Sequence, residues 1–536
     1  MLFEYRSGAI YLDNQLRSPD HSFYLTPSGN GLYNDISYID LERPDQQYVY
    51  VDVPNRQIVV NSSWYGEYPL FYFIQPDYCA VSDRFDQLYE CISASTWKMQ
   101  LDRTAIFESM IFDNLLRDRT YVKGVKKIIA GKRISIDIPS AEITQQSKFI
   151  LPFHQGNPVP SNNSLLDGAV DLLRHLLDTF SFEGSRTLLP LSGGFDSRLL
   201  ACLLLQKGVS FDSMVFGPSE GSERFVANRV GKALGIHVKN VELKNDFYKS
   251  YGDLVTLMTG GLSNHRHCHM YASMHSSQAS YDLIVHGYLG GEYAGIDQPS
   301  VAQDFNLSEE DAMEAFLAKK VYSTGIWHLL SSEERDEIRA DITDIAVDNN
   351  SVNLPCHLEE YWHNVDRQFS LTANVFAPVE EFGTVIRPFA NYEYATFFNA
   401  LPFSLREGRN LFKTAASVIS PIAFGFGNQD QFYSVDSMRG KIEGTAFEAY
   451  KRIVYGALWA SNGKIALPNP KAIERHRELL ASTLKRSLEE SVRDMSEILD
   501  KDLQFLRGVR LGNRQELSSQ YRILGIHTLL QAWNLS

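Results

Sequence analysis

Alternating apolar and polar residues dominate the first 150 positions of the chain. Side chains of a β-strand point to opposite faces at successive positions, so this alternation predicts half-buried strands. Helical spacing of apolar residues appears twice among them, at 83–92 and 102–116. The predicted strands are QYVYVDV (47–53), RQIVVNSS (56–63), LFYFIQ (70–75) and KRISIDI (132–138).

A polar stretch rich in proline and asparagine, HQGNPVPSNNS (154–164), predicts a linker. Beyond it, short apolar strands alternate with amphipathic helices, which is typical of a parallel sheet with right-handed crossovers. We therefore expect a β-rich domain over 1–153, followed by an α/β domain over 165–536 that ends in a helical part. The expected strands are 186–191, 211–217, 237–243 and 281–287, and the expected helices are 165–180, 223–235, 308–323, 332–348 and 470–506.

Composition narrows the class of protein. The chain has 536 residues, of which 44% are hydrophobic and 22% charged, which indicates a soluble protein of at least two domains. Its formal net charge of −14 argues against general binding to nucleic acid. The sequence contains neither an apolar run long enough to cross a membrane nor an N-terminal signal peptide, so we expect a cytoplasmic protein. Its five cysteines lack paired spacing and are expected to be free thiols.

The most specific motif follows the strand predicted over 186–191. Leu191 ends the apolar run, and Ser192, Gly193, Gly194, Phe195, Asp196 and Ser197 form a loop that leads into a helix. Glycines let the backbone approach a ligand closely, and N–H groups at a helix N-terminus bind anions. Asp196 would repel a bare phosphate, so we expect Mg²⁺ between them, because Mg²⁺ prefers carboxylate and phosphate oxygens. The Gly-Lys-Ser/Thr of the Walker-type loop is absent.

The pattern S-G-G-x-D-S resembles the pyrophosphate loop of ATP pyrophosphatases, and further motifs resemble the asparagine synthetase family. The run YVYVDVPNRQIVVNSSWYGEYPLFYF resembles that family's run ending in Gly-x-x-Pro-Leu-Tyr-Tyr, in its glutaminase domain. YCAVSDRFDQL and TYVKGVKKIIAGKRISID are similar to later parts of the same domain. The resemblance implies an N-terminal glutaminase-like domain, a synthetase domain, and ATP with Mg²⁺ as cofactors.

Glutaminase activity is not expected. Family members use an N-terminal cysteine whose own amine can act as base, whereas position 2 here is Leu2. RSPD (Arg17–Asp20) and NGLYN (Asn30–Asn34) resemble glutamine-site motifs, but they stand too close together. We read them as coincidence or relics, and we predict that the chain does not hydrolyse glutamine.

The second phosphate-side motif of the family resembles IVHGYLGGEYAG (284–295). By this resemblance, the backbone of His286 and Gly287 contacts the nucleotide, and Glu292 is a second metal ligand beside Asp196. Tyr288 stands where β-lactam synthetases carry a catalytic tyrosine. That tyrosine pairs with a glutamate whose aligned position here is Thr384, although Glu380 and Glu381 are near. A catalytic role and a packing role for Tyr288 therefore both stay open.

Two cations and one strand residue complete the predicted site. ALPFSLREGRNLFKTAA (400–416) resembles a family segment with a lysine and an arginine, whose places are taken by Arg409 and Lys413. Cations there would stabilise charge on the α-phosphate and the leaving pyrophosphate; two basic residues on a solvated helix are the alternative. The resemblance assigns the backbone of Val215 to adenine.

A separate cluster of possible metal ligands occurs in SNHRHCHMYASMH (263–275). It contains His265, His267, Cys268, His269 and His275, and His265 and His269 could share a helix face. No zinc-finger or metalloprotease signature accompanies them. The cluster has three interpretations: it lines a polar pocket, it consists of structural or surface histidines, or it forms a metal site.

The sequence favours an ATP-dependent ligase that adenylates a small-molecule or peptide carboxylate, releases pyrophosphate and forms an amide. The amine would be ammonia, a second substrate or a group of the same molecule. β-Lactam synthetases and lasso-peptide cyclases resemble asparagine synthetases without a glutaminase, so maturation of a peptide, a specialised metabolite or a polysaccharide is the expected context. A nucleotide-binding scaffold and an RNA-modifying adenylating enzyme are alternatives. A homodimer or a partner protein stays open.

Overall fold

The computed structural model describes most of the chain. The described residues are 2–6, 9–13, 15–17, 23–25, 32–33, 46–95, 97–149, 151–154, 156, 161–217, 222–243, 246–295, 308–348, 357–428, 431–433, 438–439, 441–442, 445–446, 449–450, 452–453, 472–503, 506, 514–533 and 535.

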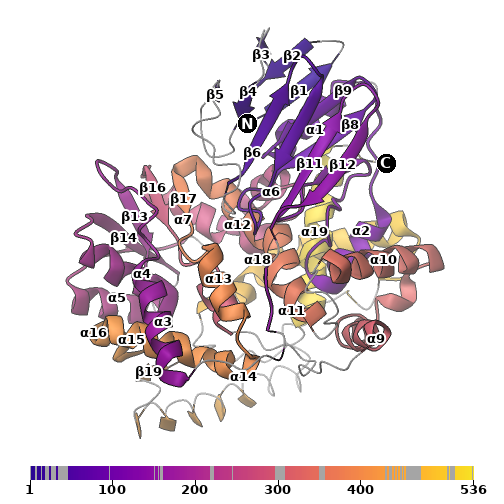
Figure 1. The fold of residues 1–536 in the computed structure, drawn as a ribbon. Helices are drawn as coiled ribbons and strands as arrows, with labels where there is room; N and C mark the ends of the chain where they lie inside the picture. The colour runs from indigo at the N-terminus through magenta and orange to yellow at the C-terminus, as the bar shows by residue number, and fades with distance from the viewer. Residues whose placement is uncertain are drawn as a thin grey trace.

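The N-terminal region is a sandwich of two antiparallel sheets (Figure 1). Alternate residues of both sheets, such as Phe3, Val60 and Val81, point inward and form one buried apolar cluster. This is the arrangement that period-two alternation predicts. The first sheet has the order β10 (Val125–Lys127), β8 (Phe71–Gln75), β9 (Tyr78–Ser82), β1 (Leu2–Arg6), β2 (Ala9–Leu12) and β3 (Gln15–Arg17). The second has the order β12 (Glu142–Ser147), β11 (Lys132–Asp137), β7 (Gln57–Asn61), β6 (Tyr48–Asp52), β4 (Phe23–Leu25) and β5 (Leu32–Tyr33).

A parallel sheet forms the centre of the second half and lies to the left in Figure 1. Its order is β15-β14-β13-β16-β17, and every neighbouring pair is parallel. The chain moves outward from β13 through β14 to β15 and then returns to the opposite side of β13. The carboxyl ends of β13 and β16 therefore flank a topological switch point, where open α/β sheets bind ligands. The strands are β13 (Thr187–Pro190), β14 (Phe211–Phe216), β15 (Val238–Val241), β16 (Leu283–Val285) and β17 (Thr384–Ile386).

Helices surround this sheet. The helix α4 packs against β13, α5 packs against β14 and β15, and α7 packs against β15. The helices up to residue 295 are α3 (Asn162–Arg174), α4 (Phe195–Gln206), α5 (Ser222–Leu234), α6 (Phe247–Met258), the 3₁₀ turn η2 (His265–His267), α7 (His269–Ser277) and α8 (Gly290–Ala294).

The remaining described chain is mainly helical, as expected. Its helices are α9 (Glu309–Lys320), η3 (Tyr322–Thr324), η4 (Trp327–Leu329), α10 (Ser332–Asp348), α11 (Leu358–Tyr361), the π-helical stretches η6 (Trp362–Asp366) and η7 (Gln368–Thr372), α12 (Ala373–Phe376), η8 (Ala377–Phe382), α13 (Tyr392–Asn399), α14 (Phe403–Arg406), η9 (Glu407–Arg409), α15 (Asn410–Ile419), α16 (Pro421–Phe424), α18 (Ala472–Leu499) and α19 (Arg514–Trp533). A short hairpin, β18 (Phe426–Asn428) and β19 (Gln431–Tyr433), follows α16.

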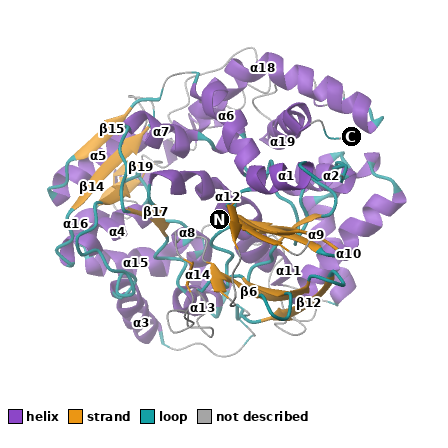
Figure 2. Ribbon diagram, turned by 90° about the horizontal axis from the view of Figure 1, so that it is seen from above, coloured by secondary structure: helices purple, strands orange, loops and turns teal. Residues whose placement is uncertain are grey.

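The sandwich and the helical end of the chain are joined through α1 (Phe85–Ser93) and α2 (Arg103–Phe112) (Figure 2). The hydroxyl of Tyr89 donates to the carbonyl of Trp533 at 2.6 Å, and their rings stack with centroids 4.3 Å apart. One apolar cluster runs from the outer face of the first sheet into the core around the parallel sheet. The two expected domains therefore share an apolar core.

Each strand and helix that the sequence predicted has a counterpart, with shifts at the ends. Residues 155 and 157–160 of the linker expected over 154–164 lie outside the described residues, and α3 begins at Asn162 rather than at Leu165. The same helix ends at Arg174 instead of 180. The motifs Arg17–Asp20 and Asn30–Asn34 lie mostly outside the described residues as well.

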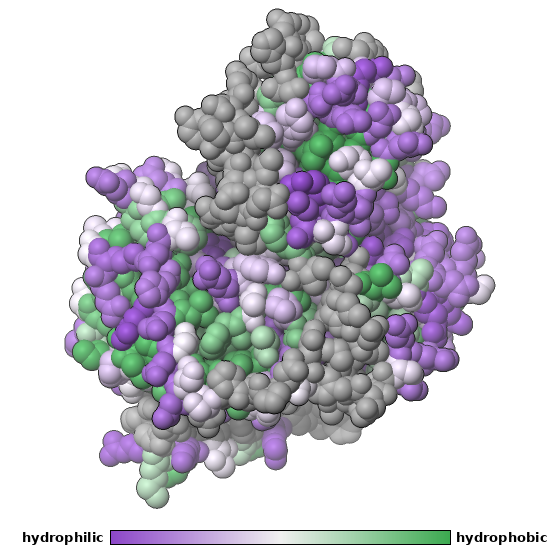
Figure 3. Space-filling view, in the orientation of Figure 1, coloured by the Kyte–Doolittle hydropathy of each residue, from purple (hydrophilic) through white to green (hydrophobic). Residues whose placement is uncertain are grey.

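The described surface is largely polar, with some exposed apolar side chains. Leu205 on α4, Phe225 on α5 and Ile422 on α16 are among them, and green side chains gather over this part of the molecule in Figure 3. Within the described ranges, no helix combines the length and the apolar character needed to cross a membrane. Four cysteines are free and buried, and Cys356 lies outside the described residues.

Candidate functional site

The loop after β13 forms a compact turn at the N-terminus of α4. The N–H of Leu191 donates to the carbonyl of Met214 on the neighbouring strand at 2.8 Å, which holds the start of the loop against the sheet. The N–H of Ser192 donates to Oγ of Ser197 at 3.1 Å, and the N–H of Gly194 donates to Oγ of Ser192 at 3.1 Å. Gly194 caps α4 in an extended conformation, without a side-chain hydrogen bond. The turn therefore gathers N–H and hydroxyl donors at a helix N-terminus, where an anion is favoured.

The glycine-rich segment after β16 lies directly against this turn. A Cβ atom on Gly287 would stand 3.0 Å from Cβ of Asp196 and 3.0 Å from the backbone N of Ser197. A Cβ atom on Gly290 would stand 2.7 Å from Oδ1 of Asp196. Glycine at these positions lets the two loops approach each other, so the structure brings together both motifs that the sequence singled out.

Two carboxylates meet at the contact between the loops. Burial, together with the negative charge of Asp196, raises the pKa of Glu292. Like charges near each other in a partly buried site attract a cation, and Mg²⁺ prefers carboxylate oxygens combined with phosphate oxygens. Across the described residues, no group of three or more His, Cys, Asp or Glu side chains could hold a metal ion. The pair Asp196 and Glu292 therefore fits a metal that takes its other ligands from phosphate and water.

Arg409 forms an ion pair with the carboxylate of Asp196. Its guanidinium donates to Oδ1 of Asp196, and only 8% of the Arg409 side chain is exposed, against 22% for Asp196. Arg409 adopts a left-handed conformation with φ 63°, which is uncommon outside glycine, directly before α15. The site thus holds an ion pair between residues 213 positions apart.

Lys413 stands on the first part of α15 and also faces the loop. Its Nζ lies 5.5 Å from the centre of the Phe195 ring, and Cζ of Arg409 lies 5.9 Å from the same ring. Both cations that the sequence proposed are therefore near the residue at the centre of the loop. They lie close enough to the helix N-terminus to add positive potential there.

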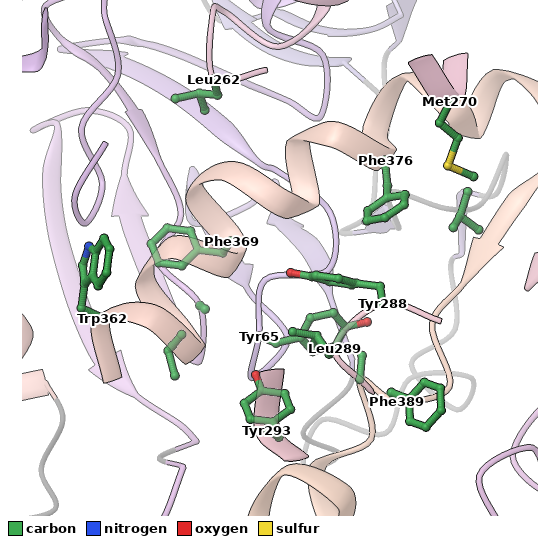
Figure 4. Close-up of a cluster of buried hydrophobic side chains, with 14 of the residues drawn as sticks. Tyr65, Leu262, Met270, Tyr288, Leu289, Tyr293, Trp362, Phe369, Phe376 and Phe389 are labelled. Atoms are coloured by element: carbon green, nitrogen blue, oxygen red, sulfur yellow. The ribbon is translucent and has the colours of Figure 1, made fainter. Parts of the chain in front are cut away.

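Tyr288 lies in the apolar core. Figure 4 shows it among Phe369, Phe376 and Tyr65. Its hydroxyl is placed to donate to Oε1 of Gln368 at 3.2 Å, and burial raises its pKa. Among the described residues no glutamate is hydrogen-bonded to this hydroxyl, although the negative charge of Glu292 adds to the rise in its pKa.

The glutamates considered as partners of Tyr288 bind elsewhere. Glu380 pairs with Arg387 at 3.2 Å, and Glu381 pairs with Arg84 at 2.8 Å. The tyrosine–glutamate pair of the resemblance is therefore not formed with either residue, and the geometry favours the packing role.

The two remaining nucleotide-side residues lie on either side of β13: His286 directly follows β16, and Val215 lies on β14. The N–H of His286 donates to the carbonyl of Ile386, so this part of its backbone is used within the sheet. Burial, with Arg387 beside it, lowers the pKa of His286 to about 3, so its ring is neutral at physiological pH. Val215 is buried on β14, opposite Asn240 of β15.

The histidine cluster does not form a metal site in the described structure. His265 and His269 do not share one helix, because η2 ends at His267 and α7 starts at His269. His265 bonds Asp253 at 3.0 Å, and His275 bonds the hydroxyl of Tyr251 at 2.9 Å. The rings therefore have separate partners, which favours structural histidines.

Other residues of the cluster are also held apart. Burial lowers the pKa of both His267 and His269 and raises that of the Cys268 thiol. The ring of His269 lies 5.5 Å from that of Phe216, at the carboxyl end of β14. His269 thus approaches the carboxyl edge of the sheet, as lining of a polar pocket would require.

Two arginines at the site were not singled out from the sequence. Arg198 follows the loop motif directly and is buried beneath it. Arg387 is buried between Glu67 of the sandwich and Glu380 of η8. A charged residue within an apolar run was the available signal for Arg198, whereas the partners of Arg387 are distant in sequence.

No known protein family model matches the chain, and no curated protein matches it. The site is therefore interpreted from its own geometry, which combines a donor-rich loop, two carboxylates and two cations at a switch point of a parallel sheet.

Proposed function

We propose that this chain is an ATP-dependent ligase that activates a carboxylate as its adenylate. A carboxylate oxygen attacks the α-phosphorus of ATP, and the bond to the pyrophosphate leaving group breaks. An amine nitrogen then attacks the acyl carbon, AMP leaves, and the nitrogen loses a proton as the amide forms. The amine is ammonia, a second substrate or a group of the same molecule.

One observation carries the proposal: three segments that are distant in sequence converge on Asp196. These segments are the loop itself, residues 287–292 with Gly287, Gly290 and Glu292, and Arg409 before α15. Their meeting point lies at the carboxyl ends of β13 and β16, beside the switch point of the sheet. A phosphate chain is a ligand that needs both N–H donors and cations at such a place.

The residues have separate roles in this proposal. The loop N–H groups bind the pyrophosphate end, and Asp196 with Glu292 would hold Mg²⁺, which when bound neutralises phosphate charge. Lys413 adds positive charge beside the leaving pyrophosphate. Arg409 moves from the carboxylate to the phosphates, where its fork-shaped donors suit two oxygens.

The test is exchange of labelled pyrophosphate into ATP with a panel of amino acids, peptides and sugar acids. Wild-type protein should support exchange with at least one carboxylate, and Asp196→Ala should reduce it by on the order of 100-fold or more. Asp494→Ala, on α18, is the control because it also removes a partly exposed carboxylate that has a basic partner, here His527 at 3.1 Å. Equal exchange by wild type and Asp196→Ala would refute the site.

A nucleotide-binding scaffold is the second candidate, and the Asp196–Arg409 ion pair favours it. An arginine on the carboxylate competes with a metal ion, and Tyr288 is bonded within the core rather than to an acid. A scaffold would bind ATP but show no exchange with any carboxylate. Equilibrium binding of ATP, measured beside the exchange assay, separates the two functions.

A further inference from the structure

Arg198 occupies an unusual place for a charged residue. It stands at the end of the first turn of α4, directly before the fully buried Leu199, Leu200 and Ala201, and its own exposed fraction is 0%. Burying an ion costs several kcal/mol unless partners compensate for the lost water. The contacts of Arg198 must therefore account for its presence beneath the loop.

The guanidinium donates to backbone carbonyls on two sides. On one side it reaches the carbonyl of Gly193 in the loop at 2.9 Å. On the other it reaches Gly427 at 2.7 Å, Ala423 at 3.2 Å and Phe426 at 3.3 Å. These three residues follow α15, which carries Lys413. Arg198 therefore connects the loop by hydrogen bonds to the segment that follows α15.

Other buried arginines of the described chain pair with a carboxylate. Arg198 has no ion pair or hydrogen bond to a carboxylate among the described residues, and its Nε has no hydrogen-bond partner. Burial lowers the pKa of Arg198 to about 10, so it remains a cation at neutral pH. The carboxylate-paired arginines are Arg387 with Glu67 and Glu380, Arg406 with Glu360, Arg409 with Asp196, and Arg522 with Asp113.

We propose that Arg198 is the positioning residue of the pyrophosphate subsite and that its charge is balanced by the phosphates of the bound ligand. This inference rests on the proposed function. The carbonyl of Gly193 and the N–H of Gly194 belong to one peptide group and point in opposite directions. Holding that carbonyl on Arg198 therefore directs the N–H of Gly194 away from Arg198, where it donates to Oγ of Ser192 and so fixes the hydroxyl side of the loop.

The positive charge of Arg198 should also attract the phosphates of a ligand bound at the loop. It stands behind the loop, in an interior where its field is weakly screened, and it adds to the potential of the helix N-terminus. The affinity of pyrophosphate and of ATP should be increased by this charge, because both carry phosphates that reach the loop. The affinity of AMP, which lacks a β- and a γ-phosphate, should not be.

The experiment compares Arg198→Met, Arg198→Lys and a matched buried arginine, Arg522→Met. Arg522 stands on α19, where it bonds Asp113 at the end of α2 and the carbonyl of Leu262. Binding of inorganic pyrophosphate, ATP and AMP, each with Mg²⁺, is measured by calorimetry, and folding is checked by circular dichroism.

Arg198→Met should bind pyrophosphate and ATP at least about tenfold more weakly while AMP binding changes less than about twofold, because charge-assisted hydrogen bonds are lost. Arg198→Lys should be about threefold weaker, since one ammonium cannot reach both sides of the clamp. Arg522→Met should bind all three ligands like the wild type despite lower stability. A purely structural role for Arg198 would weaken all three ligands alike.

Pyrophosphate and ATP affinities of both Arg198 variants within twofold of wild type would overturn the inference and leave the proposed function intact. If Arg198→Met does not fold, wild-type affinity in Arg198→Lys alone overturns it. A wild-type protein that binds neither pyrophosphate nor ATP overturns the nucleotide site and the inference together.

Discussion

The ion pair between Asp196 and Arg409 makes a prediction that does not depend on any substrate. Opposite charges about 4 Å apart attract by about 4 kcal/mol at an effective dielectric constant of about 20. Desolvation offsets part of this, and Asp196 retains 22% exposure of its side chain while Arg409 retains 8%. The exposure of this ion pair is intermediate between that of surface pairs and that of fully buried pairs. Surface pairs stabilise a fold by at most about 1 kcal/mol, and we expect this pair to contribute more. We expect a coupling free energy of roughly 2 kcal/mol.

A double-mutant cycle measures this coupling. Asp196→Asn leaves the buried guanidinium without its carboxylate, and Arg409→Gln leaves the carboxylate without its cation, so each should destabilise the fold. The double variant should recover roughly 2 kcal/mol relative to the sum of the single effects. Urea unfolding is followed by tryptophan fluorescence, using the transition that Asp196→Asn shifts, because a chain of this size can unfold in several steps. A coupling below about 0.5 kcal/mol would refute the proximity of the two groups.

Three further perturbations test the neighbourhood of the site. Gly290→Ala puts a Cβ atom 2.7 Å from Oδ1 of Asp196, so pyrophosphate exchange should fall about tenfold or more with the circular dichroism unchanged; a wild-type rate would contradict the contact. Tyr288→Phe should lower stability by about 1 kcal/mol and leave exchange within about threefold of wild type, whereas a loss on the order of 100-fold would establish a catalytic hydroxyl. Burial raises the pKa of Glu380 from 4.5 to about 7, so the protonated form is favoured on folding and stability falls as pH rises through that range. Glu380→Gln removes this titration, and its stability relative to wild type should rise by on the order of 2 kcal/mol between pH 5 and pH 7.5; a flat difference would contradict it.

Local patterns were sufficient for most elements of this fold. Period-two alternation located the central strands of the sandwich, and the apolar runs 186–191 and 211–217 contain β13 and β14. The short strand β17 was not predicted, because Thr384–Ile386 is an edge strand of three residues whose pairing with β16 comes from tertiary contact. The helix after the linker was predicted six residues too long, since it ends at Arg174 and the chain turns through residues 175–179.

Part of the candidate site could likewise be predicted from local sequence, and part could not. Glycines, hydroxyls and an acid between a strand and a helix already indicate an anion site, because that chemistry lies within six consecutive residues, Ser192–Ser197. The sequence could also nominate Glu292, Arg409 and Lys413, but only as separate segments.

Only the tertiary structure decided what these residues do to one another. In the folded chain Asp196 pairs with Arg409, the hydroxyl of Tyr288 donates to Gln368, and Arg198 is buried against carbonyls from two segments. Each of these outcomes depends on groups that lie 80 or more positions apart in the chain, or on the loss of water around a charge. Local pattern encodes neither, because distance and desolvation exist only once the sheet and its helices have packed.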